Sequence, residues 1–135
     1  VDGQKIRFTI QTSAGTTGAF LGNTTLSIGT WYHVAGVWDG SNASIYLNGV
    51  SDATPSSLGG TLGNNSSPLT VGTLRTLTTP TKFMDGKIDE VRVYNRALSA
   101  SEISALYKSG SVSHKVPNNL GLVGYWSMNE GTSTT

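Results

Sequence analysis

The sequence predicts an all-β fold, an antiparallel sandwich that carries one short helix. Charged residues make up 13% of the 135 residues, against roughly 25% in an average soluble protein. The 17 glycines and the many Ser, Thr and Asn residues are typical of a secreted module with exposed turns. Apolar and polar residues alternate in several short segments, as they do in half-buried β-strands. The length allows one domain with one core.

Each predicted strand rests on its own pattern. In the first strand, Ile6, Phe8 and Ile10 alternate with polar residues, which predicts one buried and one exposed face. Residues 31–38 instead carry apolar side chains at both odd and even positions. This pattern predicts a central strand that is covered on both faces. Residues 51–81 form a polar rim, rich in Gly, Ser and Thr, that contains one predicted strand, residues 69–74. The predicted strands span residues 5–11, 26–30, 31–38, 44–47, 69–74 and 87–94.

Turn and cap residues divide these segments. Asp39-Gly40 and Asn48-Gly49 predict two hairpin turns, because both dipeptides tolerate positive φ. Ser99 followed by Glu102 forms a capping box, which predicts a helix over about residues 100–108 with Leu98 and Ile103 as a hydrophobic staple. Residues 111–119 then read as a linker, and residues 120–128 as a further strand.

Charge and cysteine content exclude several classes of partner. Nine basic residues and eight acidic ones leave a net charge of +1, which is too small to attract nucleic acid or an anionic membrane surface. No apolar run reaches the roughly 20 residues that a membrane-spanning helix needs. The chain has no cysteine, so disulfides and thiolate metal sites are excluded. We therefore expect no nucleic-acid partner and no membrane insertion.

Four segments together resemble the bacterial laminin G-like, concanavalin A-like family. Residues 86–99 read Gly-Lys-Ile-Asp-Glu-Val-Arg-Val-Tyr-Asn-Arg-Ala-Leu-Ser, similar to the segment that closes the family's module. Residues 124–131 read Gly-Tyr-Trp-Ser-Met-Asn-Glu-Gly, similar to the segment that opens it. Residues 29–40 and 45–49 match its middle strands. The resemblance implies an antiparallel jelly-roll β-sandwich.

The order of these segments has consequences for the domain organisation. The opening segment follows the closing one, and the family's usual strands before residues 5–11 are missing. We expect a sandwich over residues 1–110, a linker over 111–119 and an opening-type strand over 120–135. That strand is permuted, belongs to a next repeat, or is donated to a neighbour. Its strand-exchange residues would be Leu120, Leu122, Val123, Tyr125, Trp126 and Met128.

Catalytic patterns are weak, and we expect no enzyme and no catalytic residues. His33 lies in a predicted strand and His114 in the linker, and no nucleophile motif accompanies either. Asp89 and Glu90 are neighbours on a strand and point to opposite faces, so they cannot form a glycosidase pair by themselves. A glycosidase would need a second inward carboxylate near Asp89.

Asp89 is the carboxylate of greatest interest, because it shares parity with Val91 and Val93 and should point inward unless a bulge intervenes. A buried carboxylate needs a partner, which is either a calcium ion or an arginine, Arg92 or Arg96. The family resemblance implies a structural calcium ion bound by Asp89, Asn129 and Glu130. A hydrogen-bonded structural carboxylate is the alternative.

Aromatic side chains are the candidates for ligand binding, because sugar rings stack on them. Trp31, Trp38 and Trp126 could form such a surface, although Trp38 and Trp126 share parity with apolar neighbours and fit a core equally well. Tyr32, Tyr46 and Tyr94 are the predicted ligand-binding residues.

The prediction for function is an extracellular or cell-surface binding or adhesion module, with a glycan or cell-surface ligand as partner. The alternative is a structural subunit of an extracellular assembly or filament, which self-associates through its C-terminal strand. A glycosidase is the third hypothesis.

Overall fold

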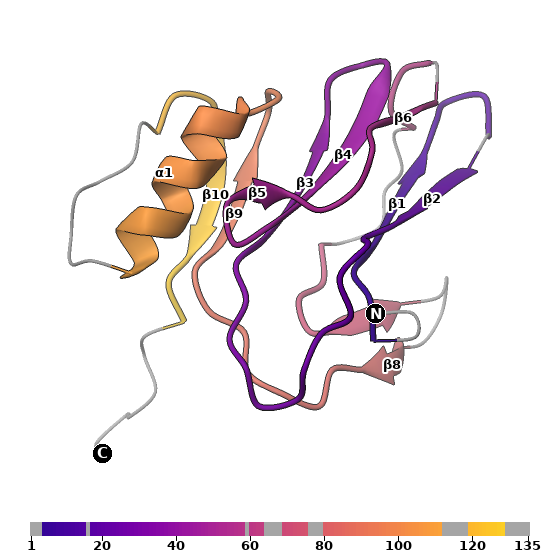
Figure 1. Cartoon of the computed structure of the whole chain (residues 1–135). Helices are drawn as coiled ribbons and strands as arrows, with labels where there is room; N and C mark the ends of the chain where they lie inside the picture. Colours follow the sequence, from indigo (N-terminus) through magenta and orange to yellow (C-terminus); the bar gives the residue numbers. More distant parts are fainter. Residues whose placement is uncertain are drawn as a thin grey trace. The chain divides into compact units, whose positions relative to one another are not determined.

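The computed structural model describes residues 4–15, 17–58, 60–63, 69–75, 80–111 and 119–128. The chain divides into two compact units, and each is described by itself. Unit 1 comprises Val1–Gly63 and Arg96–Leu120, and unit 2 comprises Asn64–Asn95 and Gly121–Thr135. Figure 1 shows the elements in chain order.

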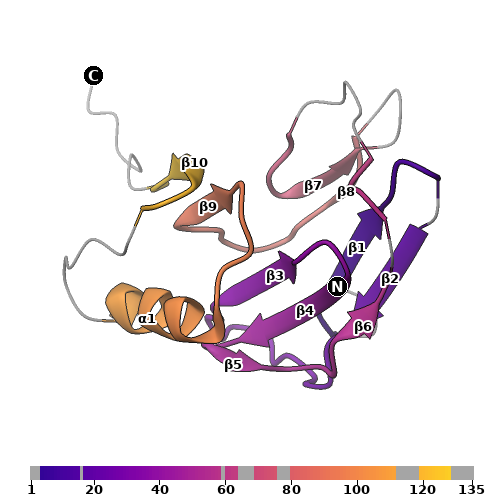
Figure 2. The same cartoon turned by 90° about the horizontal axis from the view of Figure 1, so that it is seen from above.

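Unit 1 holds a two-stranded sheet, a four-stranded sheet and a helix. In the first sheet β1 and β2 run antiparallel, with Phe8 opposite Phe20. In the second, β4 pairs with β3, with β5 and with β6, all antiparallel. Figure 2 shows α1 beside β5. The elements are β1 (Arg7–Gln11), β2 (Thr17–Leu21), β3 (Val34–Trp38), β4 (Asn42–Leu47), β5 (Val50–Ser51), β6 (Ser56–Ser57) and α1 (Ala100–Ser111).

The two predicted hairpin turns are present. Gly40 has φ +99°, and the Asp39 carboxylate accepts the backbone N–H groups of Asn42 and Ser41, which lowers the pKa of Asp39. Asn48 and Gly49 both have positive φ, +51° and +78°, as the type I′ turn requires. Local turn chemistry therefore sets the register of β3, β4 and β5.

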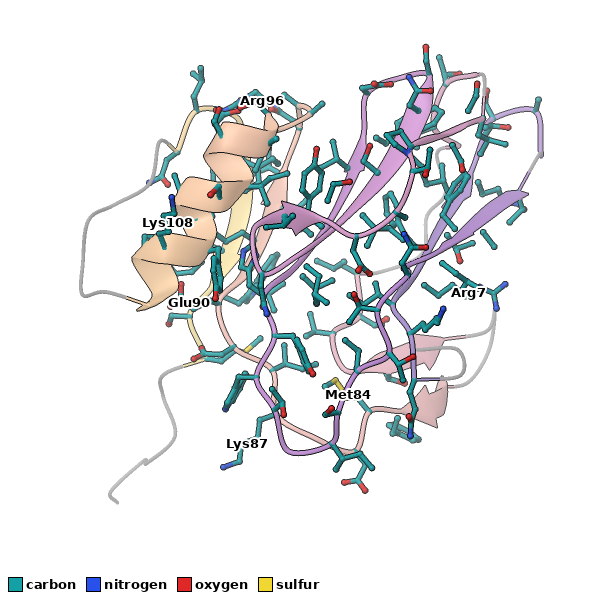
Figure 3. The ribbon with its side chains drawn as sticks, in the orientation of Figure 1. Arg7, Met84, Lys87, Glu90, Arg96 and Lys108 are labelled. Carbon is teal, nitrogen blue, oxygen red and sulfur yellow. The ribbon has the colours of Figure 1, made fainter. Side chains whose placement is uncertain are left out.

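Helix α1 begins with the predicted capping box. The Ser99 N–H donates to Glu102 Oε2 at 2.8 Å, and the Glu102 N–H donates to Ser99 Oγ at 3.3 Å. Arg96 Nη2 lies 2.6 Å from Glu102 Oε1, and Figure 3 labels Arg96 at this end of the helix. The Arg96 hydrogen bonds, followed by those from Ser99, lower the pKa of Glu102 to about 2. The helix extends to Ser111, about three residues beyond the predicted end at residue 108.

The core of unit 1 consists of Ile6, Ile45 and Leu47, with Phe8, Phe20, Leu26, Tyr32 and Ala53 packed against them. The inward face predicted for the first strand is confirmed, since Ile6 and Ile10 are buried. Helix α1 buries Ile103 and Leu106 on one face.

Unit 2 contains two antiparallel pairs, and the last two strands are far apart in the sequence. The register places Leu122 opposite Tyr94, Tyr125 opposite Arg92 and Trp126 opposite Val91, with a shift between residues 122 and 124. The strands are β7 (Thr73–Arg75), β8 (Pro80–Phe83), β9 (Val91–Tyr94) and β10 (Leu122–Trp126). Within the described ranges, antiparallel strands and a single helix confirm the all-β class.

Four strand predictions were wrong in whole or in part. The strand predicted over residues 69–74 begins only at Thr73, the first residue of β7. Residues 26–30 form a turn, with Ile28 exposed and Gly29 at φ +77°. The strand predicted over 31–38 begins at Val34, which is exposed, and its only described ladder partner is β4. The strand predicted over 87–94 begins at Val91, because Glu90 takes φ +54°.

Candidate functional site

The first candidate site is the turn Ser27–Tyr32 of unit 1, which displays apolar side chains. The Ser27 N–H donates to the Tyr32 phenol oxygen at 3.0 Å and closes the turn. This N–H donor also lowers the pKa of Tyr32. Ile28 is 92% exposed and Trp31 is 62% exposed. The turn therefore holds an indole ring in solvent on a hydrogen-bonded frame, where a flat ligand could stack on it.

Tyr32 has a structural role in this turn, because its ring packs against the core while its hydroxyl oxygen accepts the Ser27 N–H. Tyr46 is half-buried in β4, opposite Ala35 and Ser51. Tyr94 lies in unit 2, and its hydroxyl is buried without a hydrogen-bond partner among the described residues. The structure thus shows Tyr32 and Tyr46 in one unit and Tyr94 in the other, and their ligand-binding role stays a prediction.

A buried carboxylate stabilises the segment that precedes this turn. Asp52 is buried, and it accepts hydrogen bonds from the Thr24 N–H at 3.2 Å and from the Thr24 hydroxyl. A Cβ atom at Gly22 would lie 2.2 Å from Asp52 Oδ2, so only glycine fits beside the carboxylate. The role of Asp52 was not predicted from the sequence. The loop sequence Gly22-Asn-Thr is only a weak signal for this contact, because no neighbouring residue identifies Asp52, 28 residues after Thr24, as the acceptor.

The second candidate site is the cluster of Glu90, Arg92 and Tyr125 on β9 and β10. Arg92 Nη2 lies 2.5 Å from Glu90 Oε2, and the Tyr125 hydroxyl donates to Glu90 Oε1 at 2.7 Å. The Arg92 guanidinium carbon lies 4.8 Å from the centre of the Tyr125 ring. The hydrogen bond to Glu90, more than burial, raises the pKa of Tyr125. These three side chains form a closed set of contacts between the strands.

The geometry of this cluster follows from the register and from one strained residue. Tyr125 is directly opposite Arg92 in the ladder, so their side chains share a face. Glu90 reaches both because its positive φ turns the backbone just before β9 begins. A non-glycine residue in this region costs about 1–3 kcal/mol, which neighbouring contacts must offset. Figure 3 labels Glu90, and the signal that could have found the cluster is the Glu-Val-Arg spacing.

Gly124 and Trp126 explain another part of the opening motif. A Cβ atom at Gly124 would lie 2.6 Å from Trp126 Cη2 and 2.7 Å from Cζ3. The indole therefore lies across the position where a larger residue would place its side chain. Gly124 and Trp126 are two positions apart on β10, so they lie on the same face of the strand. The Tyr125 side chain lies on the opposite face.

The inward direction predicted for Asp89 is not observed. Asp89 is exposed, and its carboxylate accepts the N–H of Glu90 at 2.9 Å. The irregularity at Glu90 breaks the alternation on which the prediction depended. Asn129 and Glu130 lie outside the described residues, and the described part of the chain has no group of three or more His, Asp or Glu side chains able to hold a metal ion. The calcium site stays a prediction.

The histidines and the strand-exchange residues have the following places. The His33 ring lies 5.9 Å from that of Tyr107, and His114 lies outside the described residues. Leu122, Val123, Tyr125 and Trp126 belong to β10, whereas Leu120 and Met128 flank it. Within the described residues, no helix has the length and apolarity needed to cross a membrane.

Comparisons with known proteins agree with the fold. A crystal structure of an S-layer domain-containing protein (residues 221–444) from Clostridium thermocellum ATCC 27405 is similar, with a TM-score of 0.51 and 27% sequence identity. The match covers 76% of this chain and 51% of that one, so this chain spans about half its length. No curated protein matches the chain.

The family model described as concanavalin A-like lectin/glucanases superfamily, Laminin_G_3, matches residues 1–104. This range contains the first nine strands and the start of the helix. The antiparallel sheets and the single helix within the described ranges are consistent with its β-sandwich. The chain therefore belongs to the concanavalin A-like lectin/glucanase superfamily of laminin G-like domains.

Proposed function

We propose that the chain is a non-catalytic extracellular module that binds a glycan at a cell surface. The observation that carries the proposal is Trp31, which the closed turn Ser27–Tyr32 holds 62% exposed. A pyranose ring offers an apolar C–H face that an indole can cover. The hydroxyl groups of Ser27 and Thr30, which contact the Tyr32 phenol in this turn, would accept hydrogen bonds from the sugar hydroxyls.

Two further facts support this function. The superfamily includes lectins by its name, and the similar solved structure comes from a protein named for an S-layer domain. Asp89 is exposed and Glu90 is held by Arg92 and Tyr125, so these neighbouring carboxylates differ from the two facing carboxylates of a glycosidase. A scaffold with an exposed aromatic side chain fits recognition better than turnover.

The test is a titration of the full chain with a panel of soluble polysaccharides, with and without calcium. Binding is monitored by tryptophan fluorescence. Trp31→Ala should weaken binding about tenfold, which corresponds to about 1.4 kcal/mol. Phe83→Ala is the matched control, since Phe83 is also an exposed aromatic residue but lies in unit 2. Absence of binding to every polysaccharide, or equal binding by Trp31→Ala, would contradict the proposal. Calcium dependence would support the predicted calcium site.

A further inference from the structure

Strand β10 is attached to β9 by contacts that a strand from another molecule could make equally well. Its ladder partner among the described residues is β9, and the two strands are separated in the chain by the helix and residues 112–119. The Asn95 N–H donates to the Gly121 carbonyl oxygen at 2.8 Å and extends the pairing by one step. These bonds depend on the sequence of the two strands and not on the connection between them.

The side chains of β10 remain largely in solvent. Val123 is 60% exposed and Tyr125 is 46% exposed, and Trp126, Leu120 and Met128 are also exposed. The segment therefore gains little from apolar burial where it lies, and the ladder and the cluster of Glu90, Arg92 and Tyr125 hold it. An edge strand with exposed apolar side chains is a template for pairing between chains.

The contacts with β9 also determine which strand fits. Tyr125 must meet Glu90 and Arg92, and Trp126 must lie over a glycine at position 124. The register shift between Leu122 and Gly124 places the two aromatic residues opposite Arg92 and Val91. A strand with a different order of glycine and aromatic residues would lose the contacts of Tyr125 with Glu90 and Arg92, or the position of the indole over Gly124.

We propose that β9 is a docking site for residues 120–128 of a second copy of this chain, and that copies join head to tail by exchanging β10. The occupant is argued from the structure itself, because this segment already fits β9 in register, and an exchanged strand makes the same bonds. The eight steps from Ser111 to Asn119 span at most about 28 Å, enough to reach an adjacent molecule. Because donor and acceptor are different surfaces, the contact can repeat and form an open chain.

Engineered cysteines test the exchange directly, since the chain has none of its own. Val91 and Trp126 are opposite each other, and directly opposed strand residues lie about 4.5–5.5 Å apart, within disulfide range. Full-length Val91→Cys and Trp126→Cys variants are mixed, oxidised at several concentrations and run on a non-reducing gel. We expect a crosslinked dimer that increases with concentration.

The control mixture pairs Val91→Cys with Leu122→Cys, which is out of register because Leu122 faces Tyr94. It should give at least about tenfold less dimer, as should each variant alone. A Val91→Cys, Trp126→Cys double variant that closes only within one chain, with no dimer from the mixture, would overturn the proposal. Equal dimer from both mixtures would also overturn it. If Trp126→Cys does not fold, Tyr94→Cys with Leu122→Cys replaces the in-register pair.

A second pair of substitutions tests the role of the cluster. In the crosslinking background, Tyr125→Phe removes the hydroxyl that donates to Glu90 and should reduce the dimer yield several-fold. Tyr107→Phe removes the same hydroxyl group from helix α1, in unit 1, and should leave the yield unchanged. Equal yields from the two variants would refute the assignment of Glu90 and Arg92 as the residues that select the strand.

Discussion

Substitution of Gly49 by alanine should destabilise the contact between the β4–β5 turn and helix α1. Gly49 has φ +78°, and a Cβ atom there would lie 3.2 Å from Ser104 Cα and 3.1 Å from Tyr107 Cδ1. Both partners belong to the helix. The substitution thus adds backbone strain and a steric conflict at one position.

A matched control separates the two costs. Gly29 has φ +77°, and a Cβ atom there would have no neighbour within 4 Å. A residue other than glycine in this conformation costs about 1–2 kcal/mol, so Gly29→Ala should lose that amount. Gly49→Ala should lose about 1 kcal/mol more, the lower end of the cost of overpacking, because the helix must move by only a few tenths of an ångström.

The measurement is urea unfolding followed by circular dichroism. With a slope of about 2 kcal/mol per molar urea, the extra loss lowers the midpoint of Gly49→Ala by about 0.5 M relative to Gly29→Ala. Midpoints that agree within error would refute the reasoning, since the helix would then not rest on the turn. A large loss for both variants would show that strain alone dominates.

Three other substitutions address single side chains. The pKa of Glu102 is lowered from 4.5 to about 2, chiefly by hydrogen bonds from Arg96. The stability that the ionised Glu102 contributes is therefore present above pH 4.5 and is lost as the pH falls toward 2. Glu102→Gln should reduce this dependence of the melting temperature on acid pH. Asp52→Ala should cost roughly 1–3 kcal/mol in urea unfolding, because the Thr24 N–H loses its acceptor. Tyr94→Phe should be neutral or stabilising by up to about 1 kcal/mol, and clear destabilisation would mean that the hydroxyl has a partner.

Signals confined to a few neighbouring residues predicted their structures well. The turn at Asn48 and Gly49 and the cap at Ser99 and Glu102 form as expected, because each set of donors and acceptors lies within four residues. Strand β2 was missed for the opposite reason. A Cβ atom at Gly18 would lie 2.7 Å from Phe20 Cζ and 2.8 Å from Leu58 Cδ2, so packing with a distant residue requires a glycine that lowers the strand signal.

The prediction of a strand over residues 26–30 failed because apolar character alone does not place a residue in a core. Ile28 is apolar and exposed, and the turn around it depends on the Ser27–Tyr32 hydrogen bond and on the conformation of Gly29. Gly29 was visible in the sequence and could have indicated a turn. Val34, two residues beyond this turn, is also exposed, although an apolar run at both parities had predicted cover on both faces.

Asp89 and Tyr125 illustrate the limit for a functional site. The alternation that placed Asp89 inward ends at Glu90, whose positive φ accompanies contacts with Arg92 and with Tyr125, 35 residues away. Periodicity along one segment cannot detect such a contact. The resemblance of the two motifs to one family could have indicated this contact, because a residue of each motif has its partner in the other. Glu90 of the closing motif accepts a hydrogen bond from Tyr125 of the opening motif. The two motifs are therefore one physical unit, whether a single chain supplies both or two chains supply one each.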